Sequence, residues 1–68
     1  MILKIQVLRE KRLQKGFSQE YMALAIEISQ AHYSRIERGE RKVDIETLGK
    51  ILQILDLDIQ EIVVAEPE

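Results

Sequence analysis

Residues 12–42 read RLQKGFSQEYMALAIEISQAHYSRIERGERK and contain the start and stop signals of two short helices. Ser18 and Ser29 each favour a helix N-cap, because a serine hydroxyl accepts a hydrogen bond from a backbone N–H that the first helical turn leaves free. Two helices are therefore predicted, over 19–26 and 30–38. Only two or three residues join them, and so short a connection makes the helices cross at a steep angle, as in a helix-turn-helix.

Helical spacing continues on both sides of this pair. A preceding helix places Ile5 and Leu8 three residues apart and ends at Gly16, a residue type favoured just after a helix C-terminus. Gly39 closes the third helix in the same way. A fourth helix begins after Asp44, another N-cap residue. Its apolar stripe comprises Ile45, Leu48, Ile51, Leu52 and Leu55.

A fifth, short helix is predicted from Ile59 to about Val64, because Asp58 and Glu61 have the spacing of a capping box. Alternation of apolar and polar residues, which is the pattern of a half-buried strand, occurs only briefly at 2–7. The sequence therefore predicts an all-α fold with five helices.

Length and composition restrict the class of protein. A chain of 68 residues forms one small domain, predicted over 1–68 with its motif core at 19–38 and a short acidic tail at 65–68. The chain has no cysteine and one histidine, so neither a metal site nor a cofactor is expected. It has no phosphate-binding glycine loop and no room for a substantial pocket, so an enzyme is excluded.

No apolar run reaches the roughly 20 residues that cross a bilayer, and no secretory signal is evident. The expected location is therefore the cytoplasm, with no membrane partner. A small domain without disulfides or metal often gains stability from a partner chain, so a homodimer is expected.

Charge is distributed unevenly along the chain. The net charge is −2, but residues 1–15 hold five basic side chains and one acid, and residues 29–42 hold four basic side chains against two acids. Residues 43–68 hold one lysine against seven acids. Such a dipolar molecule can present a basic face to the phosphates of a nucleic acid.

The predicted third helix has an apolar side and a polar side. At 100° per residue, Tyr33 and Ile36 point toward the core. The opposite side carries Ala31, Ser34, Arg35 and Arg38, with Gln30 at its edge. Arginine can donate two hydrogen bonds to guanine, and glutamine can form two with adenine. This side suits a DNA major groove, although a solvated face with no ligand is the alternative interpretation.

Residues 12–42 resemble the phage repressor/Cro-type helix-turn-helix family, also called the Xre family. The resemblance rests on Arg12 four residues before Gly16, the SQ pair at 18–19, Ala23 at the helix crossing and SRIERG at 34–39. It extends over about residues 5–64. It implies a lambda-repressor-like domain of five helices that binds double-stranded DNA, usually as a dimer, and regulates transcription.

The resemblance also implies roles for individual residues. Base reading is expected from Gln30, Ala31, Ser34 and Arg35. Phosphate contacts are expected from Gln19, Ser29, Arg38, Arg41 and Lys42, and less strongly from Arg9, Lys11 and Lys15. Arg12 and Glu37 are expected to form a structural ion pair that joins the first helix to the third.

Two departures from the family pattern are evident. Glu27 stands in the turn where the family usually has glycine, and a left-handed conformation at that residue would cost about 1 kcal/mol. Tyr21 and Leu24 are larger and more apolar than the polar residues usual at their positions. They could be partly buried within the monomer, or they could pack against a partner or an extended N-terminus.

A dimer interface is expected because one recognition helix reads only a few base pairs, whereas two, about 34 Å apart, can read a palindrome. The candidate interface residues are Leu57, Ile59, Ile62 and Val63. The alternative is that these residues complete the core of a monomer. Occupancy of an operator is sufficient for repression, so a repressor is expected.

A second class of function uses the same fold. The domain could be a protein-interaction module, for example an antitoxin that binds a toxin and also represses its own operon. A restriction–modification controller is another small stand-alone member of the family. An interaction module would tolerate Arg35→Ala, whereas a DNA reader would lose preference at one base position.

Overall fold

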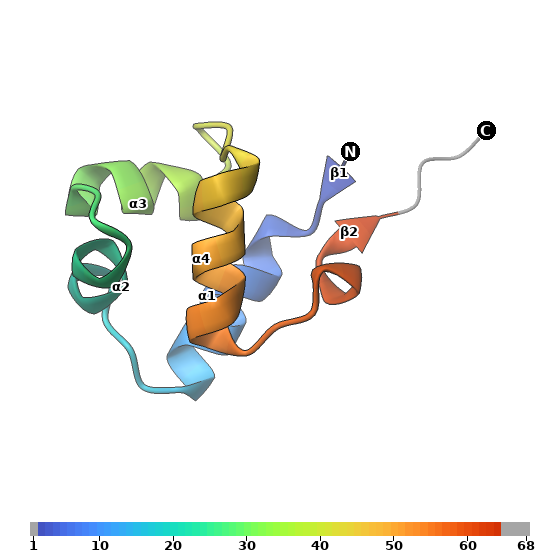
Figure 1. Ribbon diagram of the computed structural model, residues 1–68, viewed down its shortest axis with the longest axis horizontal. Helices are drawn as coiled ribbons and strands as arrows, with labels where there is room; N and C mark the ends of the chain where they lie inside the picture. Colours follow the sequence, from blue (N-terminus) through green and yellow to red (C-terminus); the bar gives the residue numbers. More distant parts are fainter. Residues whose placement is uncertain (1, 65–68) are drawn as a thin grey trace.

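The computed structural model describes residues 2–64 and contains four α-helices, with a small two-stranded sheet at one end (Figure 1). The helices are α1 (Ile5–Gln14), α2 (Gln19–Ile26), α3 (Gln30–Glu37) and α4 (Ile45–Leu55). The strands β1 (Ile2–Leu3) and β2 (Val63–Val64) lie near the two ends, and a 3-10 helix, η1 (Ile59–Glu61), precedes β2. The acidic tail expected at 65–68 lies outside the described residues.

Local capping determines where the helices begin. Ser18, Ser29 and Asp44 have extended backbones, and their side-chain oxygens accept hydrogen bonds of 2.9, 3.0 and 3.2 Å from the backbone N–H three residues later. Gly16 and Gly39 follow α1 and α3 with φ of +75° and +73°, which only glycine adopts without strain. The predicted bounds of α2 and the predicted start of α4 are confirmed, whereas α3 ends at Glu37, one residue before the predicted end.

The predicted fifth helix is wrong. The capping box is present, since the Asp58 N–H donates to Glu61 Oε2 at 2.8 Å, but the helix lasts only for η1. The chain then becomes extended in β2, where Val64 pairs with Ile2 in an antiparallel ladder. The Lys4 N–H extends this contact by donating to the Ile62 carbonyl at 2.7 Å. The all-α class of the fold is therefore confirmed, with four helices instead of five, because β-branched residues pair with the N-terminal strand instead of adding a helical turn.

The core lies around α4, which runs through the middle of the molecule with α2 and α3 on one side and the sheet on the other (Figure 1). Its buried members are Leu8, Met22, Ala23, Ile26, Tyr33, Ile36, Leu48, Ile51, Leu52, Leu55, Leu57 and Ile62. Ile45 is the exception in the predicted stripe of α4. It is exposed, because it occupies the first turn of the helix and faces away from the core.

The structure separates the four residues predicted for a dimer interface into two groups. Leu57 and Ile62 are buried in the core of the monomer and therefore leave almost no surface for a partner. Ile59 is 39% exposed and Val63 is partly buried, so these two retain accessible apolar surface. Within residues 2–64, no helix is long and apolar enough to cross a membrane.

Candidate nucleic-acid interface

The turn between α2 and α3 contains a left-handed residue that is not glycine. Glu27 has φ of 62° and ψ of 43°. Its N–H donates to the Leu24 carbonyl at 3.3 Å, and the Ile28 N–H donates to the Ala23 carbonyl at 3.0 Å. These two bonds form a Schellman motif, which usually places glycine at the left-handed position. The buried Ala23 lets the two helices approach closely at this crossing.

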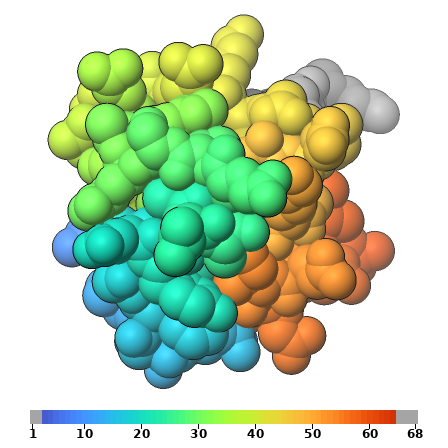
Figure 2. Space-filling view, turned by 60° about the vertical axis from the view of Figure 1, so that its left-hand side comes forward, coloured from blue at the N-terminus to red at the C-terminus, as the bar shows by residue number. Residues whose placement is uncertain are grey.

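α3 places its apolar side in the core and its polar side at the surface. Tyr33 and Ile36 are completely buried. The four residues predicted to read bases lie together with two predicted phosphate ligands in a shallow hollow of about 430 Å³, here called the α3 hollow. It is lined by Gln19, Gln30, Ala31, Ser34, Arg35 and Arg38. Figure 2 shows α2 and α3 side by side on one face of the molecule.

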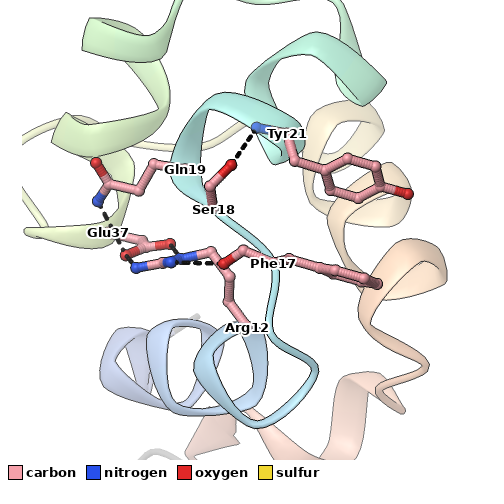
Figure 3. Close-up of polar contacts among 6 residues, drawn as sticks. All are labelled: Arg12, Phe17, Ser18, Gln19, Tyr21 and Glu37. Carbon is pink, nitrogen blue, oxygen red and sulfur yellow. Dashed lines mark hydrogen bonds and ion pairs between the residues drawn. The ribbon is translucent and has the colours of Figure 1, made fainter.

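A buried ion pair lies behind this face (Figure 3). Arg12 Nε donates to Glu37 Oε2 at 2.7 Å, and Arg12 Nη2 donates to Glu37 Oε1 at 3.1 Å. Both side chains are nearly inaccessible, at 8% and 2% exposure. Arg12 Nη1 also donates to the Phe17 carbonyl at 2.8 Å, and Gln19 Nε2 donates to Glu37 Oε1 at 3.2 Å. The network connects α1, the α1–α2 loop, α2 and α3.

The environment of the pair shifts three pKa values. Burial alone would raise the pKa of Glu37, but the hydrogen bonds and charge of Arg12 lower it below its ordinary value of 4.5. The hydrogen bond with Glu37 raises the pKa of Arg12. Burial raises the pKa of Tyr33 far above its ordinary value. The Tyr33 hydroxyl lies close enough to the pair to sense its charges, yet it makes no hydrogen bond with the residues at 2–64.

The predicted phosphate ligands do not form one cluster. Gln19 and Arg38 line the α3 hollow, whereas Arg41 and Lys42 are exposed in the loop that leads to α4. Ser29 uses its hydroxyl oxygen to cap α3, which leaves its O–H free to donate to a phosphate oxygen.

Sequence reasoning missed a carboxylate beside Arg38. Arg38 Nε lies 2.9 Å from Glu40 Oε2, and both side chains are more than half exposed. The available signal in the sequence was that Arg38 and Glu40 stand two residues apart, on either side of Gly39. The direction of the two side chains, however, depends on the left-handed backbone of that glycine.

Tyr21 and Leu24, the two apolar residues of α2 that depart from the family pattern, differ in their exposure. Tyr21 is half exposed, and its ring centroid lies 4.6 Å from that of Phe17. Both rings point away from Gln19 and Glu37 (Figure 3). Leu24 is 77% exposed. Partial burial within the monomer therefore describes Tyr21 but not Leu24.

Comparison with known proteins agrees with this geometry. A protein-family model described as helix-turn-helix matches residues 8–62. The chain belongs to the helix-turn-helix family of DNA-binding transcriptional regulators. An uncharacterised HTH-type transcriptional regulator, YqaF of Bacillus subtilis (strain 168), is 43% identical over 51 residues, which are 75% of this chain and 67% of that protein.

A crystal structure provides a second relative. The restriction-modification controller protein C.AhdI from Aeromonas hydrophila superposes with a TM-score of 0.76 at 35% identity, covering 84% of this chain and 86% of that one. The resemblance inferred from residues 12–42 is thereby confirmed, and the relatives are regulators rather than enzymes. Within residues 2–64, no group of three His, Cys, Asp or Glu side chains is placed to hold a metal ion.

Proposed function

We propose that this protein is a sequence-specific repressor that binds a palindromic operator as a homodimer, with α3 in the major groove. The observation that carries the proposal is the α3 hollow. It gathers all four predicted base readers on one accessible face, next to Gln19 and Arg38. A regulator of this kind works where the DNA is, so we also propose a cytoplasmic location.

The chemistry of α3 suits base edges in the major groove. Arg35 is exposed and can donate two hydrogen bonds to O6 and N7 of guanine. Gln30, at the start of the helix, can form two with N6 and N7 of adenine. Ala31 leaves space for a thymine methyl group, and Ser34 can donate or accept.

Phosphate contacts would surround this reading face. The proposed ligands are Gln19, Ser29, Arg38, Arg41 and Lys42. Each cation that neutralises a phosphate steepens the log–log dependence of affinity on salt by about 0.9. The role proposed for the Arg12–Glu37 pair is to hold α3 in register with α1 and α2, because both side chains are nearly buried behind the reading face.

The dimer would place two copies of α3 about 34 Å apart, one helical turn of DNA. Ile59 and Val63 support this part of the proposal, since they retain apolar surface near the sheet. The structural relative is named as a restriction-modification controller protein. We propose a similar controller role for this chain, and identification of its operator would test that role.

A protein partner is a second candidate, favoured by one observation. Leu24 exposes most of an apolar side chain on α2, beside the half-exposed Tyr21. An antitoxin-type protein could bind its toxin there. Leu24→Ser would then abolish capture of the partner and leave DNA binding unchanged.

Selection from a randomised duplex pool, followed by sequencing at moderate salt, tests the main proposal. We expect enrichment of a palindrome with half-sites about one turn apart. Arg35→Ala is expected to lose about 1–3 kcal/mol of discrimination at one position of each half-site. Lys50→Gln, which removes one exposed cation from α4, is the matched control and should select the wild-type sequence. Failure of folded protein to enrich any sequence would refute the proposal.

A further inference from the structure

The helix α2 is apolar on all sides, although only one side meets the core. Residues 21–26 read YMALAI and contain no charged or amide side chain. Three of them are buried in the monomer, namely Met22, Ala23 and Ile26. The other three are exposed, namely Tyr21, Leu24 and Ala25. A helix that is hydrophobic all round is normally covered on all sides. The monomer therefore leaves the outer side of α2 without a covering partner.

The exposed side chains form one apolar surface with the loop that precedes the helix. Tyr21 and Leu24 stand three residues apart, so they are neighbours on the helix. Phe17 extends the surface toward α1, because its ring centroid lies 4.6 Å from that of Tyr21. We call Phe17, Tyr21 and Leu24 the α2 face. Figure 2 shows α2 at the centre of one side of the molecule, between the residues that precede it and α4.

Charge around the α2 face is acidic. Residues 16–28 contain Glu20 and Glu27, both exposed, and no basic side chain. The neighbouring helix α4 contacts α2, and residues 51–58 add two acids and no base. Glu27 and Asp56 stand at helix C-termini, where the helix dipole already contributes negative charge. The surroundings of the α2 face therefore favour a cationic partner.

Glu27 is also unfavourable for the monomer itself. Its backbone is left-handed, with φ of 62°, and its carboxylate is repelled by the dipole of α2. A residue that breaks local rules without a compensating contact is expected at a functional site. This is a second indication that the acidic border of the α2 face serves binding.

Size and charge argue against a second copy of the chain as the occupant. The eight residues of α2 extend about 12 Å, so the α2 face covers on the order of 150 Å². A stable interface buries about 800 Å² on each partner. A symmetric contact would also bring Glu20 and Glu27 of both copies together, and like charges repel. A short helix with apolar anchors and basic neighbours matches both the length and the charge.

The α2 face lies apart from the base-reading face. The rings of Phe17 and Tyr21 point away from Gln19, which lines the α3 hollow (Figure 3). The acids beside the α2 face also disfavour contact with phosphates. A partner on this face would therefore leave α3 accessible to DNA.

We propose that the α2 face binds a basic amphipathic helix of another protein, and that it does so while α3 is on DNA. The inference rests on the proposed function, because simultaneous binding assumes that α3 enters the major groove. It extends the protein-partner candidate by stating the chemistry of the partner. Leu24, which is 77% exposed, is the main anchor.

The probe is a phage-displayed library of single-helix peptides, selected on the immobilised full chain. We expect enrichment of peptides with apolar residues at helical spacing and with more Lys and Arg than Asp and Glu. Enrichment of acidic peptides, or of none, would overturn the proposal.

An enriched peptide is then titrated by fluorescence anisotropy. Leu24→Ser should weaken its binding about tenfold or more, because a buried leucine anchor is lost. Ile45→Ser is the matched control, since Ile45 is an apolar residue of α4 that is 68% exposed, and it should bind as the wild type does. Circular dichroism checks that both variants are folded. Equal affinities for Leu24→Ser and the wild type would overturn the site.

Simultaneous binding is measured on complexes saturated with a generic duplex. A basic peptide also binds DNA, so the duplex complex of Leu24→Ser serves as the reference. The wild-type complex should retain more peptide than this reference, and equal retention would overturn simultaneous binding. Wild-type protein that binds no duplex would overturn the proposed function, whereas the titration without DNA tests the α2 face separately.

Sedimentation of the free proteins tests the remaining occupant. Wild type and Leu24→Ser should have the same oligomeric state. Loss of a dimer in Leu24→Ser alone would overturn the proposal, because the α2 face would then be a contact between copies of this chain.

Discussion

Replacement of Glu27 by glycine is expected to stabilise this protein. Glu27 occupies the left-handed position of the Schellman motif between α2 and α3, with φ of 62°. Its Cβ crowds the backbone in that conformation, whereas glycine has no Cβ. Its side chain is exposed and makes no hydrogen bond or ion pair with residues 2–64, so the substitution removes strain without removing a contact.

The magnitude follows from two opposing effects. Relief of left-handed strain is worth about 1–2 kcal/mol. The greater freedom of glycine in the unfolded chain costs about 0.5–1 kcal/mol. The net gain is therefore about 1 kcal/mol, which raises the midpoint of thermal unfolding by about 4–8 °C in a domain of 60–100 residues.

Thermal and urea unfolding, followed by circular dichroism, measure this gain. Glu27→Gln is the control for charge, since it removes the carboxylate near the C-terminus of α2 but keeps the strain, and it should gain only a few tenths of a kcal/mol. Asp56→Gly tests the second non-glycine residue of the described range 2–64 that has a left-handed backbone, with φ of 54°, and it should gain less because aspartate tolerates this conformation better. A midpoint for Glu27→Gly at or below that of Glu27→Gln would refute the reasoning.

Three further predictions concern the ion pairs. Arg12→Ala should lower the free energy of unfolding by about 3–5 kcal/mol in urea titrations, because it leaves the buried carboxylate of Glu37 without a partner; a loss near zero would show that the pair is dispensable. Because the pKa of Glu37 is lowered in the folded protein, its contribution to stability is complete above its ordinary pKa of 4.5 and is lost as the pH falls through the folded value. Unfolding measured from neutral to acid pH should therefore be less pH-dependent in Glu37→Gln than in the wild type, and equal dependence would contradict the assignment. Glu40→Gln should free Arg38 and tighten binding to generic duplex at low salt, with Glu46→Gln as the charge-matched control; equal effects of the two variants would mean that net charge alone is responsible.

Several features of the interface could be predicted from the sequence, because they depend on residues that are close to one another in the chain. The polar side of α3 follows from helical rotation, and the structure gathers Gln30, Ala31, Ser34 and Arg35 around one hollow. Gln6, Arg9 and Arg12 are also three residues apart, so a helical reading of α1 could have placed them on one face. That this face opens next to α3 depends on how α1 packs, which no local pattern encodes.

What the sequence by itself determined is where α2, α3 and α4 begin. Ser18, Ser29 and Asp44 cap their helices with bonds to a backbone N–H three residues away, and such contacts form wherever the local sequence permits. The same kind of signal was insufficient at the C-terminal end. The capping box beside Asp58 is present, yet the residues after η1 pair with a strand about sixty positions earlier in the chain.

Only the tertiary structure decided that outcome, because a ladder between two chain ends depends on the packing that brings them together. The same holds for burial. Leu57 and Ile62 had the composition of an interface, but η1 turns them into the core and leaves Ile59 outside. The two hydrogen bonds that Arg12 donates to Glu37 likewise depend on the packing of three helices. That packing sets the distance between the two side chains, which cannot be read from their spacing in the sequence.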